Sequence, residues 1–143
     1  MIYLTGSLRN PRVLDVARQL REAGHEVFDD WMAAGPDADD QWRDYEKQKG
    51  HNLKQALAGY AARHVFEFDL FHLNRADIVV LVMPAGKSAH IELAWALGKG
   101  KKGYILFDSE PERFDVMLQF ATDVFYSVDD LINHLPLPVE EFQ

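Results

Sequence analysis

The sequence predicts one doubly wound α/β domain, flavodoxin-like or Rossmann-like, with a parallel sheet of about five strands between two helical layers. Strand-like and helix-like segments alternate along the whole chain. Residues 77–83 (DIVVLVM) are almost continuously apolar and β-branched, which is typical of a strand buried on both faces. The chain has 143 residues and is 48% hydrophobic, which suits a single core. We therefore expect a single domain over residues 1–143.

The first elements follow from short local signals. Residues 2–5 are apolar and β-prone, and the strand that they predict ends at the Gly6-Ser7 turn. Pro11 suits the first turn of a helix, and apolar residues then recur at helical spacing until Gly24. Residues 25–28 are predicted to form the second strand.

The segment Asp29–Gly59 is predicted to be a long loop with a helical insertion. Residues 29–40 are polar and contain Gly35 and Pro36, so we expect a loop there. A short helix is expected at residues 42–49, where Gly50 closes it.

The remaining chain returns to regular alternation. Residues 53–75 have a helical pattern that Gly59 interrupts, and the buried strand at 77–83 follows. Pro84-Ala85-Gly86 then turns the chain into a helix at residues 88–99, which is apolar nearly all round and is therefore expected to be buried. The last expected elements are a strand at 103–107, a helix at 112–121, a strand at 124–126 and a helix at 128–135.

Composition limits the classes of function. The net charge of −8 and pI near 5.1 oppose binding of a polynucleotide, although one arginine or a helix N-terminus can still hold a single phosphate. The chain has no cysteine, and its six histidines show no metal-binding spacing. No apolar run approaches membrane-spanning length, and no targeting segment is recognisable. We therefore expect a cytoplasmic protein without membrane contact or metal. The dinucleotide fingerprint G-x-G-x-x-G is missing, so we expect no cofactor. The serine hydrolase motif G-x-S-x-G is missing too, which opposes that class of enzyme.

In such folds a ligand lies beyond the carboxyl ends of the strands, where the strand order reverses. Three segments are expected there: Gly6–Asn10, Asp29–Trp31 and Pro84–Glu92. Within the last of these, Glu92 is the only acidic residue between Asp77 and Asp108. A carboxylate held at the mouth of a pocket can attack an anomeric carbon. The alternative is that Glu92 merely complements the helix dipole.

Asp69 is the second candidate, because its neighbours on a helix would be Val65, Phe66 and Leu73. Burial raises the pKa of a carboxyl group, which suits a group that hands a proton to a leaving base. Alternatively, Asp69 is structural and bonds to a backbone N–H or to Arg75.

The turn after the first strand offers weaker signals. Gly6, Ser7 and Arg9 could hold a phosphate or sugar oxygens through a hydroxyl, free N–H groups and a guanidinium. Tyr3 would ordinarily be a core residue, but its hydroxyl could steady a carboxylate if it reaches the ligand end of the strand.

Two blocks of the sequence resemble the nucleoside 2-deoxyribosyltransferase-like family, which includes 2'-deoxynucleoside 5'-phosphate N-hydrolases. Residues 2–9 (IYLTGSLR) match its opening strand and turn. Residues 64–108 match its order and spacing through Asp69-Leu70, ADIVVL and the ELAWA helix that contains Glu92.

This resemblance implies cleavage or transfer of the N-glycosidic bond of a 2'-deoxynucleoside or its 5'-monophosphate. It implies Glu92 as the nucleophile, Asp69 as an aid to proton transfer and Tyr3 as the residue that orients Glu92. In the monophosphate-hydrolysing branch Ser7 and Arg9 would hold the 5'-phosphate, with Ser88 nearby. It also implies a homodimer or larger homo-oligomer.

The sequence departs from the family at Asn10, where the hydrolase branch often has glycine. It also lacks the further acidic residue that transferases carry before the glutamate helix, since Ala85-Gly86-Lys87 stands there. The transferases' subunit-shared asparagine has no equivalent around Asp123-Val124 either. Two alternatives stay open, a ribonucleotide or NAD-type glycohydrolase and a nucleotide-binding sensor module without turnover.

Overall fold

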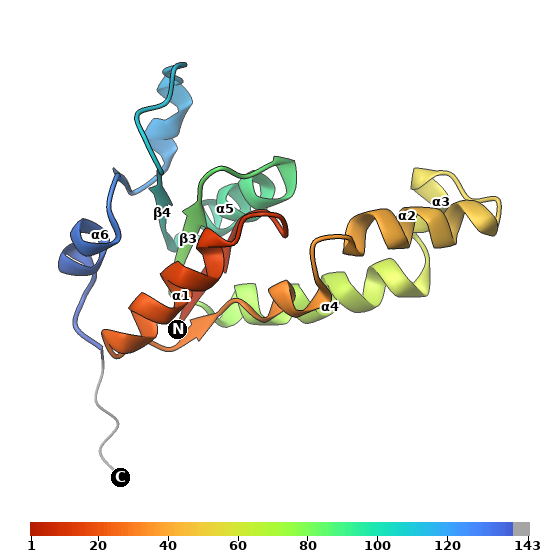
Figure 1. Cartoon of the computed structure of the whole chain (residues 1–143), viewed down its shortest axis with the longest axis horizontal. Coiled ribbons are helices and arrows are strands. Elements are labelled where there is room, and N and C mark those ends of the chain that lie inside the picture. Colours follow the sequence, from red (N-terminus) through yellow and green to blue (C-terminus); the bar gives the residue numbers. More distant parts are fainter. Residues whose placement is uncertain (139–143) are drawn as a thin grey trace, which may run out of the picture.

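The computed structural model describes residues 1–138, so residues 139–143 of the predicted domain lie outside the described residues. Its centre is one sheet of five parallel strands in the order β2-β1-β3-β4-β5 (Figure 1). This arrangement confirms the predicted doubly wound α/β fold. The strands are β1 (Ile2–Thr5), β2 (Val27–Phe28), β3 (Ile78–Val82), β4 (Lys102–Leu106) and β5 (Asp123–Phe125).

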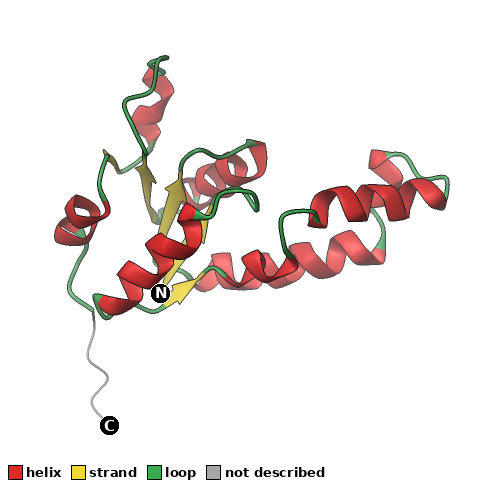
Figure 2. Ribbon diagram, viewed as in Figure 1, coloured by secondary structure: helices red, strands yellow, loops and turns green. Residues whose placement is uncertain are grey.

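Helices cover both faces of the sheet, because alternate strand residues point to opposite sides. Leu4 and Val80 pack on the face covered by α1 (Arg12–Glu22) and α6 (Val128–His134). Tyr3 and Val79 pack on the other face, which is covered by α4 (Tyr60–Arg75) and α5 (Lys87–Gly98). Figure 2 shows α1 in front of the strands, with α4 and α5 behind them.

The segment predicted as a long loop is largely helical, which corrects the prediction for residues 29–40. It contains a 3₁₀ helix η1 (Asp30–Ala34) and the helices α2 (Ala38–Gln48) and α3 (Leu53–Leu57). Asp39 and Asp40 lie in the first turn of α2, where acidic side chains stabilise a helix. Figure 1 shows α2 and α3 extending away from the sheet beside α4. We call α2 and α3 together the helical arm.

A hydrogen bond between buried Glu46 and His51 joins the end of α2 to the turn before α3. Glu46 is 2% exposed, and its Oε2 lies 2.6 Å from Nδ1 of His51. Asn52 and Gln55 then form a reciprocal capping box at the start of α3. These local bonds explain why a polar sequence forms helices here.

Three further predictions were wrong in detail. The second strand spans only Val27–Phe28, and the helix expected at 112–121 is a shorter 3₁₀ helix, η2 (Val116–Phe120). The side chain of Asp115 caps η2 by accepting from the N–H of Met117. Helix α5 is not buried all round, because Ile91 is 69% exposed. Its apolar composition therefore gave no information on which side faces solvent.

Candidate active site

A cavity of about 410 Å³ lies at the carboxyl ends of β1 and β3, where the strand order reverses. The turn after β1 lines it with Gly6, Ser7, Leu8 and Arg9. The start of α5 contributes Gly86 to Ala89 and Glu92, and the segment after β2 contributes Trp31, Pro36, Asp39 and Asp40. The chain thus brings together residues from all three segments singled out in the sequence.

Two hydroxyl groups hold the carboxylate of Glu92. Tyr3 Oη donates to Glu92 Oε2 at 2.6 Å, and Thr5 Oγ1 donates to Oε1 at 3.2 Å. Tyr3 and Thr5 are both 1% exposed, and they share one face of β1 because side chains two apart in a strand point the same way. Helix α5 packs on that face, so each carboxylate oxygen meets a donor that is fixed in the sheet.

Burial raises the pKa of Glu92, and the nearby negative charge of Asp69 raises it further. The hydrogen bonds from Tyr3 and Thr5 act in the opposite direction, since they favour the carboxylate. Burial and the charge of Glu92 also raise the pKa of Tyr3, so its phenol keeps the proton that it donates. The carboxyl group of Glu92 therefore has limited solvation, and two fixed donors favour its ionised form.

Asp69 lies on α4 beside this pair, although neither Asp69 nor Tyr3 lines the cavity itself. Burial raises the pKa of Asp69 from 3.8 to about 6. Arg75, its possible structural partner, instead donates to Glu26 at 2.7 Å. Within residues 1–138 the side chain of Asp69 makes no hydrogen bond or ion pair. A half-buried carboxyl group with a raised pKa is suited to carry a proton near neutral pH.

The other predicted site residues line the cavity. The N–H of Arg9 donates to Ser7 Oγ at 3.1 Å, which shapes the turn after β1. The guanidinium of Arg9 donates to Asp40 of α2 at 2.9 Å. Ser88 lies exposed in the first turn of α5.

Sequence reasoning missed Thr5 and Asp40. The two-residue spacing from Tyr3 could have revealed Thr5, since it places both side chains on one face of the strand. No sequence signal marks Asp40, because its contact with Arg9 depends on how α2 folds back over the turn. Trp31 lay in a singled-out segment, and its indole N–H donates to the carbonyl of Leu4 at 2.8 Å.

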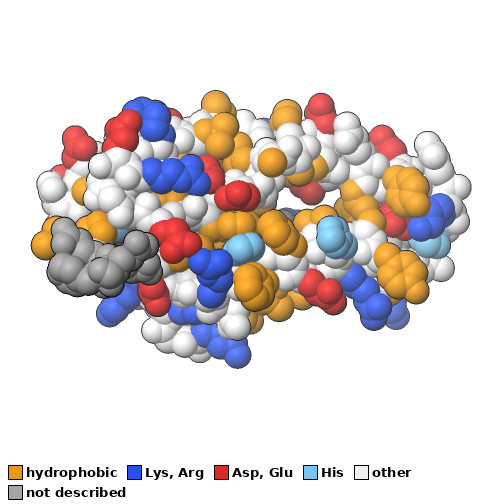
Figure 3. All heavy atoms as spheres, turned by 90° about the horizontal axis from the view of Figure 1, so that it is seen from below, with side chains coloured by type: hydrophobic (Ala, Val, Ile, Leu, Met, Phe, Trp, Pro, Cys, Tyr) orange, Lys and Arg blue, Asp and Glu red, His pale blue; other side chains and the backbone are white. Residues whose placement is uncertain are grey.

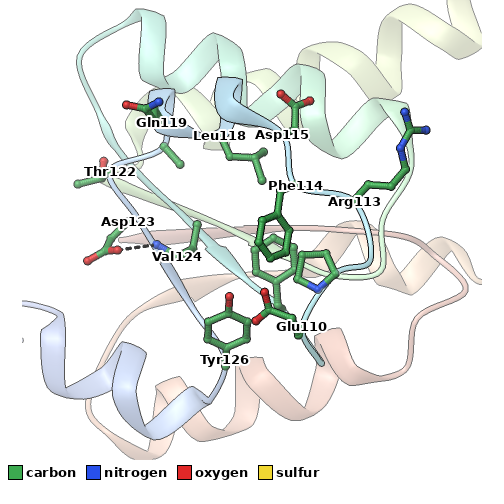
Figure 4. Close-up of a pocket in the computed structure, with 13 residues that line it drawn as sticks. Glu110, Arg113, Phe114, Asp115, Leu118, Gln119, Thr122, Asp123, Val124 and Tyr126 are labelled. Atoms are coloured by element: carbon green, nitrogen blue, oxygen red, sulfur yellow. Dashed lines mark hydrogen bonds between the residues drawn. The ribbon is translucent and has the colours of Figure 1, made fainter.

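A different cavity of about 370 Å³ lies beside β5 (Figure 4). Its lining includes Glu110, Phe114 and Tyr126, and none of the predicted site residues. In the part of the chain that the structure describes, no group of three or more His, Asp or Glu residues could hold a metal ion. No helix among residues 1–138 is both long and apolar enough to span a membrane.

No family model and no curated protein matched the sequence. Among solved structures, the chain is similar to 2-deoxyribosyltransferase from the psychrotolerant bacterium Bacillus psychrosaccharolyticus, a biocatalyst for nucleoside synthesis. The TM-score is 0.62 at 23% sequence identity, and the match covers 99% of this chain and 98% of the other. The two proteins therefore share a fold over nearly their whole lengths.

Proposed function

We propose that this chain cleaves the N-glycosidic bond of a 2'-deoxynucleoside or its 5'-monophosphate through a covalent deoxyribosyl intermediate on Glu92. The pairing of Glu92 with Tyr3 and Thr5 at the mouth of the cavity carries the proposal. The resemblance of residues 2–9 and 64–108 to the deoxyribosyltransferase-like family supports it. The 2-deoxyribosyltransferase with the similar fold supports it as well.

In the first step, one oxygen of Glu92 attacks the anomeric carbon C1' and forms an ester bond. The bond between C1' and the base nitrogen breaks, and the base leaves with the bonding electrons. Asp69 donates a proton to the leaving base, for which its raised pKa suits it. Tyr3 and Thr5 keep Glu92 in place for the attack.

In the second step, an acceptor attacks C1' and releases Glu92 as a carboxylate. Water as the acceptor gives hydrolysis and a free sugar, while a second base gives transfer and a new nucleoside. Ionised Asp69 takes up the proton of the attacking water or base, because it lost its own proton in the first step. Glu92 and Asp69 thus serve both hydrolysis and transfer.

Release of free base from a panel of deoxy- and ribonucleosides and their 5'-monophosphates, followed by chromatography, tests the proposal. Glu92→Ala should lower base release by several orders of magnitude, because the nucleophile is lost. Glu22→Ala is the matched control, because Glu22 is an exposed residue at the end of α1. A Glu92→Ala variant that keeps more than about a tenth of the activity would overturn the assignment. Cleavage of ribonucleotides alone would favour the glycohydrolase alternative.

The covalent step has its own test. A 2'-fluoroarabinosyl nucleoside should slow both steps, because fluorine destabilises positive charge at C1', and the adduct should accumulate. Intact-mass measurement and peptide mapping should then find one sugar on the peptide that contains Glu92. Inversion at C1' without an adduct would instead make Glu92 a general base.

We propose further that the chain forms a homodimer or larger homo-oligomer. Several large apolar side chains of α4 are exposed in the single chain, among them Val65, Phe66 and Phe71. Figure 3 shows hydrophobic side chains gathered on this side of the molecule. Contiguous exposed apolar surface is typical of a protein interface. Sedimentation velocity should therefore show a species of at least twice the mass of the 16.4 kDa chain.

A further inference from the structure

An ion pair crosses the mouth of the candidate site. Arg9 follows β1, Asp40 lies in the first turn of α2, and Arg9 Nη2 donates to Asp40 Oδ2 at 2.9 Å. The other carboxylate oxygen of Asp40 lies 3.4 Å from Arg43 Nη1 on the same helix. The guanidinium at the turn after β1 is thus already engaged by a carboxylate of the helical arm.

The side chains that line the cavity carry a small excess of negative charge. Three carboxylates (Asp39, Asp40 and Glu92) and two cations (Arg9 and Lys87) line it, so the net charge is −1 when Glu92 is ionised. The whole chain, these residues included, has a net charge of −8. A 5'-phosphate would bring about −1.5 to −2 more charge at neutral pH.

The charges of this cavity therefore act differently on a 5'-phosphate and on a 5'-hydroxyl. The phosphate would compete with Asp40 for Arg9, and the nearby carboxylates of Asp39 and Asp40 would repel it. A hydroxyl carries no charge, and it can donate a hydrogen bond to either carboxylate. The chemistry of the cavity mouth thus favours an uncharged 5' end.

We infer that the Arg9–Asp40 pair makes this site select a 2'-deoxynucleoside with a free 5'-hydroxyl over its 5'-monophosphate. Asp40 is then the specificity-determining residue. This inference rests on the proposed function and narrows its substrate class. It gives Arg9 a role as the partner of Asp40, in place of the phosphate contact that the sequence resemblance implies.

Two features of the same cavity attract anions, namely Lys87 and the free N–H groups in the first turn of α5. They act on a phosphate whether or not Asp40 is charged. Neutralising position 40 should therefore leave these attractions in place, weaken the pairing with Arg9 by removing its charge, and convert the cavity into a better phosphate site. The charge at position 40 decides between the two substrate classes.

Calorimetric binding of four 2'-deoxynucleosides and their 5'-monophosphates tests the inference in a Glu92→Ala background, where no substrate is consumed. The background protein should bind at least one nucleoside about tenfold more tightly than its monophosphate. Adding Asp40→Asn should shift the ratio of the two affinities toward the monophosphate by about ten- to a hundredfold, as expected for one charge-assisted hydrogen bond regained by Arg9. The same shift should appear in the ratio of kcat/KM values when Glu92 is present.

Asp44→Asn is the matched control, because Asp44 lies on the same helix, is 62% exposed and does not line the cavity. It should leave the ratio of nucleoside affinity to monophosphate affinity unchanged. Asp39→Asn removes a charge from the cavity without weakening the pairing of Arg9 with Asp40, so it should cause a smaller shift than Asp40→Asn.

Tighter binding of monophosphates by the background protein would overturn the inference, as would equal shifts from Asp40→Asn and Asp44→Asn. Failure of every nucleoside and nucleotide to bind would overturn it too. The proposed function fails separately, if ligands bind with the expected preference but the chain with Glu92 intact releases no base.

Discussion

Replacing Asp69 by asparagine should make the protein more stable and less active. Burial raises the pKa of Asp69 from 3.8 to about 6. At about 1.4 kcal/mol for each pKa unit, this shift corresponds to an upper bound of about 3 kcal/mol for holding ionised Asp69 in the folded chain. Because Asp69 is only partly buried, we expect Asp69→Asn to gain about 2 kcal/mol at pH 7.

The sign of the effect fixes its pH dependence. The folded pKa lies above the unfolded one, so the folded state binds the proton more tightly. Well below pH 4, at about pH 2, the carboxyl is protonated in both states, and no ionisation penalty applies. The penalty appears as the pH rises from about 4 to about 6 and is constant above that range. The advantage of Asp69→Asn should therefore be complete at pH 7, smaller at pH 5, small at pH 4 and absent only near about pH 2.

Urea unfolding of both proteins at pH 5, 6 and 7 measures this difference, with exposed Asp108→Asn as the matched control. Base release should fall by about 10²–10⁴-fold in Asp69→Asn, because the proton donor is lost. The wild-type rate of the first step should decline as the pH rises through about 6, where Asp69 gives up its proton. A variant with no gain in stability at pH 7 would refute the claim that burial penalises the carboxylate. A more stable variant with full activity would refute the role of Asp69 as proton donor.

Three further substitutions probe the hydroxyl donors of Glu92 and the packing of α5 on the sheet. Tyr3→Phe and Thr5→Val each remove one hydroxyl donor from Glu92, and each should raise the pKa that governs the acid limb of the pH–rate profile. The shift should be larger for Tyr3→Phe, whose bond is shorter, and an unchanged acid limb in both variants would contradict the proposed support. Gly103→Ala should lower the free energy of unfolding by about 1–3 kcal/mol, because the added Cβ would lie 2.7 Å from Leu93 and 2.8 Å from Leu97. A variant with wild-type stability in urea would show that α5 moves to make room for the Cβ without any loss in the free energy of unfolding.

The sequence by itself determined the alternation of strands and helices and singled out candidate residues at two strand ends. Buried strands and their turns are local patterns, so residues 2–7 and 77–86 could be identified without any knowledge of distant contacts. Glu92 could be singled out for the same reason, because an isolated carboxylate in an apolar helix after a buried strand is visible in a short stretch. The alternation of strands and helices then predicted where the cavity would lie.

Only the tertiary structure decided which side chains meet Glu92 and Arg9. Thr5 lies 87 positions from Glu92, and Asp40 lies 31 positions from Arg9, so neither contact follows from local periodicity. The helices at 42–49 and from 53 onward were predicted, but η1 and the first residues of α2 were missed, because Gly35, Pro36 and the polar side chains of residues 29–40 indicate a loop. The raised pKa of Asp69 likewise comes from burial. Burial depends on how α4 packs in the folded chain, and the local sequence around Asp69 does not determine it.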